Sequence, residues 1–302
     1  MSSTPCQTVQ WAYGQAGGGD VIKLAAGTYV NPDMAVEARF LAIDKDLTLA
    51  GGYSTSDWET ADPLANPTII DGENLGQLLY SNTSGITITM TGLTLQRGTG
   101  YSLQFENARL LMSDCQLINN TVSGIDVLRL YNSDNSQVVR STISNNYRGL
   151  YVYSSDNLLI DTNTISTNSS TGIQLESSNY ATLSGNTILG NSSNGVYLSG
   201  SQYATLRDNT ISGNGNYGFY SYYYNNYMLL ENNLISGHTS YGIYFDSNYA
   251  ISTVTIRDNT IQGNTLQFVL LLNEHCQAGG FHFGHAFRNS PTQGVDVGRC
   301  GR

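Results

Sequence analysis

Short apolar runs recur along the chain at a nearly constant spacing. The phrase Asp-Asn-Thr-Ile-Ser-Gly-Asn at 208–214 returns with small changes at 162–168, 185–191 and 258–264. Taking its apolar residue as the anchor gives the series Leu24, Leu49, Ile70, Leu95, Leu117, Ile143, Ile165, Ile188, Ile211, Ile235 and Ile261. A repeat of about 24 residues predicts a solenoid.

Each repeat contains apolar positions that predict strands. Five residues before the later anchors the sequence places Met90, Met112, Val138, Ile160, Leu183, Leu206, Leu230 and Ile256. A glycine followed by apolar-x-apolar begins at Gly124, Gly149, Gly172, Gly195, Gly218 and Gly242, and points residues such as Ile125 and Val127 inward. Alternation of this kind indicates strands. The LxxLxLxxN pattern of leucine-rich repeats is missing, so we expect an all-β parallel β-helix of about eleven right-handed coils with three strands each.

The repeat divides the chain into three parts. Residues 1–20 are expected to form an N-terminal cap, with a helix over 8–15 that buries Val9, Trp11 and Ala12. Residues 21–268 are expected to form the β-helix, with a loop excursion at 51–67. Residues 269–302 have no repeat and are expected to be an irregular tail. A solenoid needs such ends because its terminal coils expose unpaired strands.

Asparagine forms two columns in the repeat. The members are Asn163, Asn186, Asn209, Asn233 and Asn259 in one, and Asn120, Asn146, Asn168, Asn191, Asn214 and Asn264 in the other. A calcium site would need carboxylates as well, so we interpret both columns as hydrogen-bonded asparagine ladders between coils. His238 replaces Asn in the second column and is interpreted as a ladder member. Cys115 stands in the first column and is predicted to be a buried free thiol, too far from Cys6 for a disulfide.

Composition and charge limit the possible partners. The net charge is −10, and the 13 basic residues are scattered, which argues against binding to nucleic acid. Apolar stretches are too short to insert into a membrane. The chain has 21 Tyr and 32 Gly, and its Lys-poor surface favours an extracellular or cell-surface location, although residues 1–20 contain no signal peptide. We expect a monomer or one part of a longer modular chain.

The tail holds three of the four histidines. His275, His282 and His285 lie near Cys276 and Cys300. Imidazole and sulfur suit zinc or copper, but the spacing matches no established metal site. The tail is therefore interpreted as an irregular cap or as an out-of-frame ending. We predict no metal site and no cofactor, with Ca²⁺ expected only if the protein is a lyase.

Tyrosines recur at outward positions of the glycine phrase. One predicted outward row is Asp126, Tyr151, Gln174, Tyr197, Tyr220 and Tyr244, and its neighbour is Leu128, Tyr153, Glu176, Ser199, Tyr222 and Asp246. A shorter column contains Tyr180, Tyr203 and Tyr227. Aromatic rings with polar neighbours suit sugar binding, and the same columns also fit packing between exposed rings. The candidate ligand-binding residues are Tyr151, Tyr197, Tyr220, Tyr222, Tyr244 and Asp246.

Candidate catalytic groups are fewer. Asp126 and Glu176 lie two coils apart, on the order of 10 Å, which is poorly placed for glycoside hydrolysis. Arg207, Glu231 and Arg257 occupy equivalent positions in successive coils. An Arg beside a carboxylate fits a lyase site, whereas alternating charges fit an ion-pair row, which we favour. No catalytic residue is assigned.

Residues 6–268 resemble the pectate-lyase-like superfamily of right-handed parallel β-helix repeat proteins, of the predicted bacterial surface or secreted type. The resemblance rests on residues 19–29 (GDVIKLAAGTY), 47–54 (LTLAGGYS) and 66–72 (NPTIIDG). It implies the fold and export. The polygalacturonase and epimerase motifs are absent, since Asp62–Pro63 continues with Leu64 and Gly284–His285 with Ala286.

Two functions follow as hypotheses. The first is a non-catalytic extracellular β-helix module that binds a polysaccharide or cell-surface glycan, or serves as an adhesin-like surface stalk. The second is a polysaccharide lyase or glycoside hydrolase that acts on an acidic glycan through loop residues.

Overall fold

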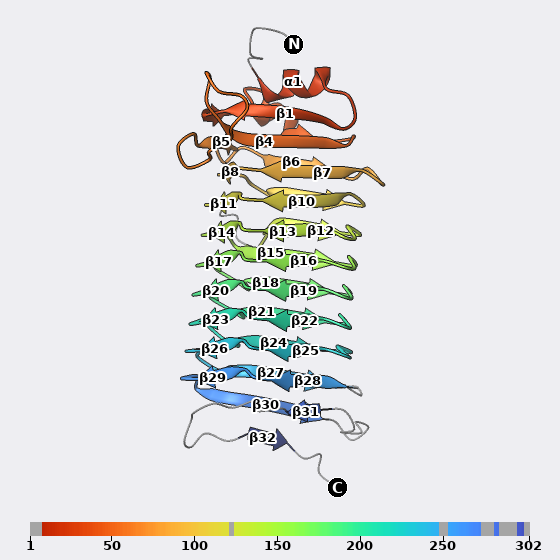
Figure 1. Ribbon diagram of the computed structural model, residues 1–302, viewed down its shortest axis with the longest axis vertical. Helices are drawn as coiled ribbons and strands as arrows, with labels where there is room; N and C mark the ends of the chain where they lie inside the picture. Colours follow the sequence, from red (N-terminus) through yellow and green to blue (C-terminus); the bar gives the residue numbers. More distant parts are fainter. Residues whose placement is uncertain (1–7, 121–123, 248–252, 273–280, 284–294, 299–302) are drawn as a thin grey trace.

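Three parallel sheets wind around one long axis (Figure 1). This arrangement is seen in a computed structural model that describes residues 8–120, 124–247, 253–272, 281–283 and 295–298. Successive strands pass from sheet A to sheet B to sheet C and back, so each neighbour in a sheet belongs to the next coil. The predicted all-β parallel β-helix is confirmed, and its ten to eleven strands per sheet roughly match the expected eleven coils.

Sheet A has eleven strands and sheet B has ten. Sheet A contains β1 (Asp20–Ala25), β4 (Leu47–Tyr53), β7 (Thr87–Thr91), β10 (Arg109–Ser113), β13 (Gln137–Val139), β16 (Leu159–Asp161), β19 (Thr182–Ser184), β22 (Thr205–Arg207), β25 (Leu229–Glu231), β28 (Val254–Arg257) and β31 (Phe281–Phe283). Sheet B contains β2 (Gly27–Tyr29), β5 (Thr68–Asp71), β8 (Leu93–Gln96), β11 (Gln116–Ile118), β14 (Thr142–Ser144), β17 (Thr164–Ser166), β20 (Thr187–Leu189), β23 (Thr210–Ser212), β26 (Leu234–Ser236) and β29 (Thr260–Gln262).

Sheet C has eleven strands. It supplies the last strand of each coil, after which the chain enters sheet A of the next coil. It contains β3 (Arg39–Ala42), β6 (Gln77–Ser81), β9 (Leu103–Glu106), β12 (Asp126–Tyr131), β15 (Arg148–Tyr153), β18 (Ile173–Glu176), β21 (Val196–Ser199), β24 (Phe219–Tyr222), β27 (Tyr241–Ser247), β30 (Leu266–Leu272) and β32 (Val295–Gly298). The strands are short because each is bounded by a corner that turns the chain into the next sheet.

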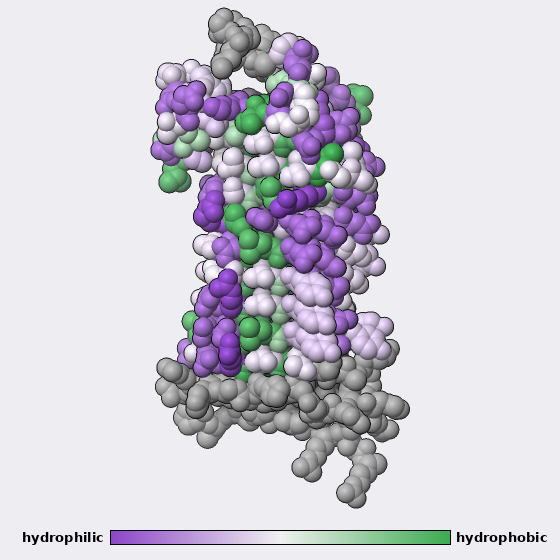
Figure 2. Space-filling view, turned by 45° about the vertical axis from the view of Figure 1, so that its right-hand side comes forward, coloured by the Kyte–Doolittle hydropathy of each residue, from purple (hydrophilic) through white to green (hydrophobic). Residues whose placement is uncertain are grey.

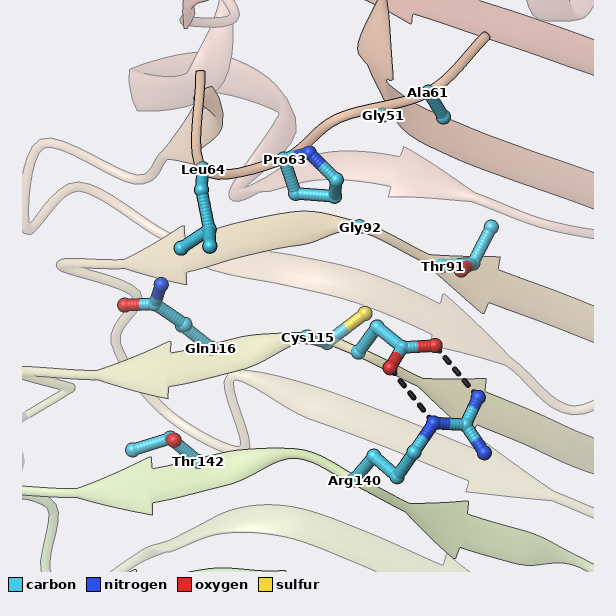
Figure 3. A pocket seen from close by; sticks show the side chains of 11 residues that line it. Gly51, Ala61, Pro63, Leu64, Thr91, Gly92, Cys115, Gln116, Arg140 and Thr142 are labelled. Carbon is cyan, nitrogen blue, oxygen red and sulfur yellow. Dashed lines mark hydrogen bonds and ion pairs between the residues drawn. The ribbon is translucent and has the colours of Figure 1, made fainter. Parts of the chain in front are cut away.

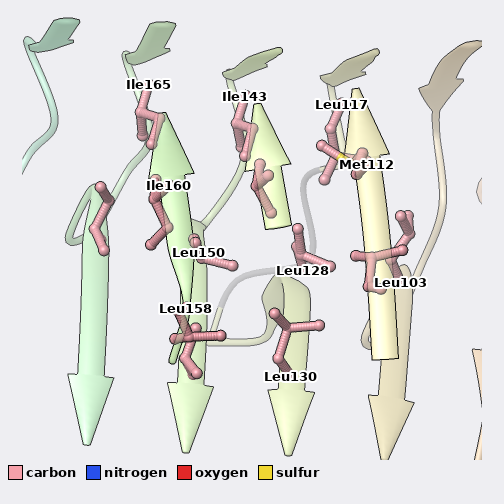
Figure 4. Close-up of a cluster of buried hydrophobic side chains, with 14 of the residues drawn as sticks. Leu103, Met112, Leu117, Leu128, Leu130, Ile143, Leu150, Leu158, Ile160 and Ile165 are labelled. Atoms are coloured by element: carbon pink, nitrogen blue, oxygen red, sulfur yellow. The ribbon is translucent and has the colours of Figure 1, made fainter. Parts of the chain in front are cut away.

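The core is a stack of apolar side chains along the axis (Figure 4). Leu103, Leu128 and Leu150 point inward from sheet C, Met112 and Ile160 from sheet A, and Leu117, Ile143 and Ile165 from sheet B, all at most 1% exposed. Each such side chain contributes about 1.5–3 kcal/mol when fully buried. The predicted inward column from Met90 to Ile256 is confirmed because its members are buried in register.

The register of the first two coils differs from the prediction. Leu24 and Leu49 lie in sheet A, where Leu49 pairs with Met90. The residue aligned with Ile70 in sheet B is Tyr29. A short helix α2 (Met34–Glu37) and the loop 54–67 lengthen these coils. Counting about 24 residues back from Ile70 therefore reaches apolar residues of sheet A and not their counterparts in sheet B. The loop also begins later than the predicted residue 51, because β4 continues to Tyr53.

Helix α1 (Val9–Gln15) lies over the first coil, next to β1 (Figure 1). The Thr8 hydroxyl accepts a hydrogen bond from the Trp11 N–H and caps the helix. Val9 is buried and Ala12 packs against the core, as predicted. Trp11 was predicted to be buried, but it is 56% exposed, because the helical period turns it away from the face that carries Val9 and Ala12.

Polar ladders line the inside of all three corners. Between sheets A and B, the Asn186 amide donates to the Ile160 carbonyl and to Asn209 Oδ1, and the same pattern continues through Asn209 and Asn233. Between sheets B and C, Asn120, Asn146, Asn168, Asn191 and Asn214 form the second ladder. Both predicted asparagine ladders are confirmed.

His238 and Cys115 are also members of these ladders. His238 Nδ1 accepts from the Asn214 N–H at 3.1 Å, and its Nε2 lies 3.1 Å from the Ile211 carbonyl oxygen. Cys115 is 1% exposed and is a free thiol, and its N–H donates to Ser141 Oγ. Both predictions are confirmed. Cys6, Cys276 and Cys300 lie outside the described residues.

A third ladder, which the sequence analysis missed, lies between sheets C and A. The backbone N–H groups of Ser133, Ser155, Ser178 and Ser201 donate in turn to the next side chain, and the series ends at Asn225. Serine is common throughout the sequence, so this column lacks the distinct signal of the asparagines. The three ladders satisfy buried backbone donors where the strands end.

Candidate functional site

The outer face of sheet C carries two columns of side chains in register. The first is Tyr80, Gln104, Arg129, Tyr151, Gln174, Tyr197, Tyr220 and Tyr244. The second is Glu106, Tyr131, Tyr153, Glu176, Ser199, Tyr222 and Asp246. Parallel pairing holds successive members about 4.8 Å apart. The face is therefore a continuous surface along the axis of the β-helix.

The register of one coil corrects the predicted rows. Asp126 was predicted to align with Tyr151, but it pairs with Arg148, and Arg129 occupies that row instead. Leu128 was predicted to point outward, but it is fully buried. The turn between β11 and β12 is longer than the corresponding turn before β15, so Gly124 is not equivalent to Gly149. Of the residues predicted to point inward, Val127 is buried and Ile125 only partly so.

The C-terminal half of this face is a cluster of partly exposed tyrosines. We call it the tyrosine patch, and its members are Tyr197, Tyr217, Tyr220, Tyr222, Tyr241 and Tyr244. Tyr220 is its centre, with ring centroids 5.1–5.2 Å from those of Tyr197, Tyr217 and Tyr244 and interplanar angles of 62–68°. The predicted column is in register, but its rings meet edge to face and are not stacked flat.

Two members of the patch were missed from the sequence. Tyr217 stacks on Tyr244 at 4.7 Å and 5°, and the Tyr241 ring lies 5.2 Å from that of Tyr244. Both stand directly before a glycine of the glycine phrase. That recurring Tyr-Gly pair is the signal that would have revealed them. The glycines bring the coils close together, since a Cβ at Gly218 would lie 2.6 Å from the Gly242 carbonyl oxygen.

Asp246 places a negative charge at the edge of the tyrosine patch. It pairs in register with Tyr222, and its Oδ2 lies 3.5 Å from the Tyr220 hydroxyl. Burial raises the pKa of Tyr220, and Asp246 raises it further. Burial also raises the pKa values of Tyr197, Tyr217 and Tyr244, with Asp246 among the further causes for each. The field of Asp246 therefore reaches across the patch.

A charged cluster lies on the same face toward the N-terminus. Arg148 Nη1 lies 2.6 Å from Asp126 Oδ1, and its guanidinium lies 5.1 Å from the Tyr151 ring centroid. The Tyr151 hydroxyl is 3.3 Å from Glu176 Oε2. Burial, followed by the charge of Glu176, raises the pKa of Tyr151 to about 12. Burial also raises the pKa of Asp126, against the opposing charge of Arg148.

Tyr151 thus belongs to the charged cluster and not to the tyrosine patch, because Gln174 separates it from Tyr197. The predicted Asp126 and Glu176 lie two strands apart with β15 between them. Arg148 and Arg129 were not predicted as site residues. The Arg129 guanidinium lies over the Tyr101 ring at 4.6 Å, and its Nε is buried without a hydrogen-bond partner among the described residues.

A second tyrosine column lies at the corner between sheets C and A. Tyr180, Tyr203 and Tyr227 stack with ring centroids 4.8 Å apart and planes within 9°. All three have a φ near +58° and are 42–52% exposed. Figure 2 shows pale rings piled along the axis on this side of the molecule. Stacked in this way, the rings cover one another and present mainly their edges.

The predicted ion-pair row in sheet A is partly formed. Glu231 and Arg257 align in register and form an ion pair at 2.6 Å. Arg207 aligns with Glu231, but its ion pair is with Asp208 at 3.5 Å. These groups lie in sheet A, away from the face that carries the tyrosine patch.

The loop 54–67 forms one side of a hollow of about 460 Å³ (Figure 3). Pro63 and Leu64 lie on one side, and the ion pair between Arg140 and Asp114, at 2.7 Å, lies on the other. Cys115 also lines it, and burial raises the pKa of its thiol to about 12. A thiol with a raised pKa stays protonated, and a protonated thiol is a poor nucleophile. The hollow therefore offers no activated group from Cys115.

Metal ligands do not gather anywhere in the part of the chain that the structure describes: no group of three His, Cys, Asp or Glu side chains could hold an ion there. The side chains of His275, His282 and His285 lie outside the described residues. Among the described helices, none has the length and apolar character needed to cross a membrane.

Solved structures with a similar fold include enzymes that act on polysaccharides. The A-modules of the Azotobacter vinelandii mannuronan C-5 epimerases AlgE4 and AlgE6 both match with a TM-score of 0.57, at 15% and 14% identity. The match covers 93% of this chain and 82% of the AlgE4 module, and 92% and 83% for AlgE6. Pectate lyase Pel9A matches with a TM-score of 0.50 at 13% identity, over 93% of this chain and 72% of the lyase. At these identities the likeness shows a shared fold.

None of the curated proteins matches this sequence. The family model described as the right handed beta helix region matches residues 127–289. That match covers more than half of the chain and includes the tyrosine patch and most of the charged cluster. It agrees with the three parallel sheets and the corner ladders seen in the structure. The chain belongs to the right-handed β-helix family.

Proposed function

We propose that this chain is a non-catalytic extracellular or cell-surface β-helix module that binds a polysaccharide or cell-surface glycan. The contact surface is the outer face of sheet C. It includes Tyr197, Tyr220, Tyr222 and Tyr244 in the tyrosine patch, Asp246 at the edge of the patch, and Tyr151 in the neighbouring charged cluster. The module acts as a monomer or as part of a longer chain.

The observation that carries this proposal is the tyrosine patch itself. Successive coils present partly exposed tyrosine rings in register, with hydroxyl and carboxylate groups at their edges. Sugar rings have apolar faces that pack on aromatic rings and hydroxyls that need hydrogen-bond partners. A repeating surface suits a repeating polymer. Mannuronan and pectate, the polymers named for two structural neighbours, are also glycans.

The test compares two triple variants of the full chain. Tyr197, Tyr220 and Tyr244 are replaced by Ser in one, and the corner residues Tyr180, Tyr203 and Tyr227 in the other. Retention is measured by affinity electrophoresis on a panel of acidic and neutral polysaccharides. At about 1 kcal/mol per ring, the first triple should weaken binding about a hundredfold, and the corner triple should retain it.

Stability decides how the result is interpreted. The Tyr220 ring contacts Tyr197, Tyr217, Tyr222 and Tyr244, so the first triple also removes packing that circular dichroism and thermal unfolding will detect. If it fails to fold, Tyr197→Ser takes its place, because its one described ring contact is with Tyr220. Equal retention of wild type and a folded patch variant would refute glycan binding by this surface and leave the role of a surface stalk.

The charged cluster supports a second candidate, a polysaccharide lyase or glycoside hydrolase that acts on an acidic glycan. Arg148 and Tyr151 lie together with the carboxylates of Asp126 and Glu176, and such groups provide acid, base and charge stabilisation. The same panel is assayed for new reducing ends and for unsaturated products. If the wild-type chain forms new reducing ends or unsaturated products and Tyr151→Phe does not, the enzyme alternative is established. If the wild-type chain binds a polysaccharide but forms no product, the non-catalytic module is supported.

A further inference from the structure

The coils that carry the tyrosine patch are poor in basic residues. From residue 149 to residue 266 the sequence has seven acidic residues and only two basic ones, Arg207 and Arg257. Both basic residues lie in sheet A, where each pairs with a carboxylate. Arg148 and Arg129 belong to strands nearer the N-terminus, in the charged cluster. The patch itself therefore contains no cation among the described residues.

Asp246 is the charged group of the patch. Its neighbour in the next strand toward the N-terminus is Tyr222, and its carboxylate faces the Tyr220 hydroxyl at 3.5 Å. No ion pair to Asp246 is formed by the residues that the structure describes. Among the described residues, the partly exposed carboxylate of Asp246 has the Tyr220 hydroxyl as its hydrogen-bond partner. No described cation therefore neutralises its charge.

The ring geometry favours the same kind of ligand. Aromatic faces are electron-rich and ring edges are electron-poor, so a cation is stabilised over a face. The Tyr220 ring meets the rings of Tyr197, Tyr217 and Tyr244 at 62–68°, so its face points in a different direction from theirs, while Tyr217 and Tyr244 are parallel to each other. Ring faces that point in more than one direction can contact an ammonium group from more than one side. A carboxylate-bearing polymer would meet like charge at Asp246 and at Glu176, which lies further along the same face.

We propose that the tyrosine patch binds glycans that carry protonated amino groups, such as oligomers of glucosamine, in preference to neutral or acidic glycans. This inference rests on the proposed function and names its ligand class. The amine lies against the tyrosine rings and pairs with Asp246, while the sugar rings extend along the face of sheet C. Burial is the largest cause of the raised pKa values of the patch tyrosines, and the charge of Asp246 adds to it.

The experiment compares three hexamers that differ in charge: glucosamine, N-acetylglucosamine and galacturonate. Binding to the full chain is measured by isothermal titration calorimetry below the pKa of the amine, at low and high salt. The glucosamine hexamer should bind about tenfold tighter than the N-acetylglucosamine hexamer, because only it carries cations. The difference should shrink at high salt and when the pH is raised to deprotonate the amine.

Two variants with the same change of net charge locate the effect. Asp246→Asn should abolish most of the preference for the amine while the N-acetylglucosamine hexamer still binds. The control is Asp258→Asn, an exposed carboxylate at the corner after β28, which should retain the preference. Since Asn keeps the oxygen that accepts from Tyr220, Asp246→Asn should fold normally, and circular dichroism will check this.

The other results separate the two proposals. Tighter binding of the galacturonate or N-acetylglucosamine hexamer, or a preference for glucosamine that Asp246→Asn leaves intact, would overturn the amine assignment while glycan binding stands. Failure of all three hexamers and of the polysaccharide panel to bind would overturn both the amine assignment and the glycan-binding function.

Discussion

Replacement of Asn186 by Ala should show how much one rung of a corner ladder contributes to stability. The Asn186 side chain accepts hydrogen bonds from the Asn163 N–H and the Asn163 amide at 3.0 Å, and donates to the Ile160 carbonyl at 2.8 Å. It is 1% exposed. Alanine removes all of these bonds and leaves the Asn163 N–H without an acceptor and the Ile160 carbonyl without this donor.

The magnitude follows from those two backbone groups. A buried polar group that loses its partner costs about 1–3 kcal/mol, so Asn186→Ala should lower the free energy of unfolding by about 2–6 kcal/mol. Asn186→Ser should cost less, because Ser141 already occupies this ladder and its hydroxyl accepts from the Cys115 N–H. Serine at 186 would likewise leave an acceptor for Asn163.

Equilibrium urea unfolding, followed by circular dichroism, measures these differences. The control is Asn157→Gly, at an exposed position with a φ of +58° that glycine adopts readily, and it should change stability by less than about 0.5 kcal/mol. The argument is wrong if Asn186→Ala is no more destabilising than this control, or if serine at position 186 costs as much as alanine.

Two further predictions concern buried ladder members. Burial lowers the pKa of His238, so on acidification the unfolded chain takes up a proton at His238 at a higher pH than the folded chain. The free energy of unfolding should therefore fall as the pH drops below about 6.5. His238→Asn should reduce this pH dependence, and an unchanged pH profile would contradict the assignment of His238 as a buried neutral ladder member. The Cys115 thiol is buried and its pKa is raised to about 12, so Cys115→Ser should leave maleimide labelling of the native protein unchanged and remove one labelled thiol in urea. Loss of native labelling in that variant would show that Cys115 is accessible.

Repetition made most of the fold predictable. A solenoid places every coil in the same environment, so an apolar residue that recurs at each anchor must face the shared core. The columns at Ile143, Ile165 and Ile188 are in register for this reason. Asparagine ladders were equally visible, because only a side chain that both donates and accepts can bridge successive coils at a buried corner.

The prediction failed where a coil departs from the repeat. Helix α2 and the loop 54–67 shifted the early anchors, and a longer turn before β12 misplaced Asp126 and Leu128. When an inserted segment leaves another apolar residue at the expected spacing, the repeat pattern gives no sign that the insertion is there. The pairing of backbone groups between coils decides the register there.

The sequence by itself determined the parallel β-helix, its core columns, its asparagine ladders and the register of Tyr197, Tyr220 and Tyr244, since each depends on a residue type recurring at a fixed interval. Only the tertiary structure decided how those rings meet, how Tyr217 and Tyr241 pack against Tyr244, and that Arg148, Tyr151 and Glu176 form one cluster. These contacts join different columns and coils, and they depend on side-chain direction and on local turn length. A one-dimensional period specifies neither of these, so the chemistry of the face emerges only when the coils are stacked.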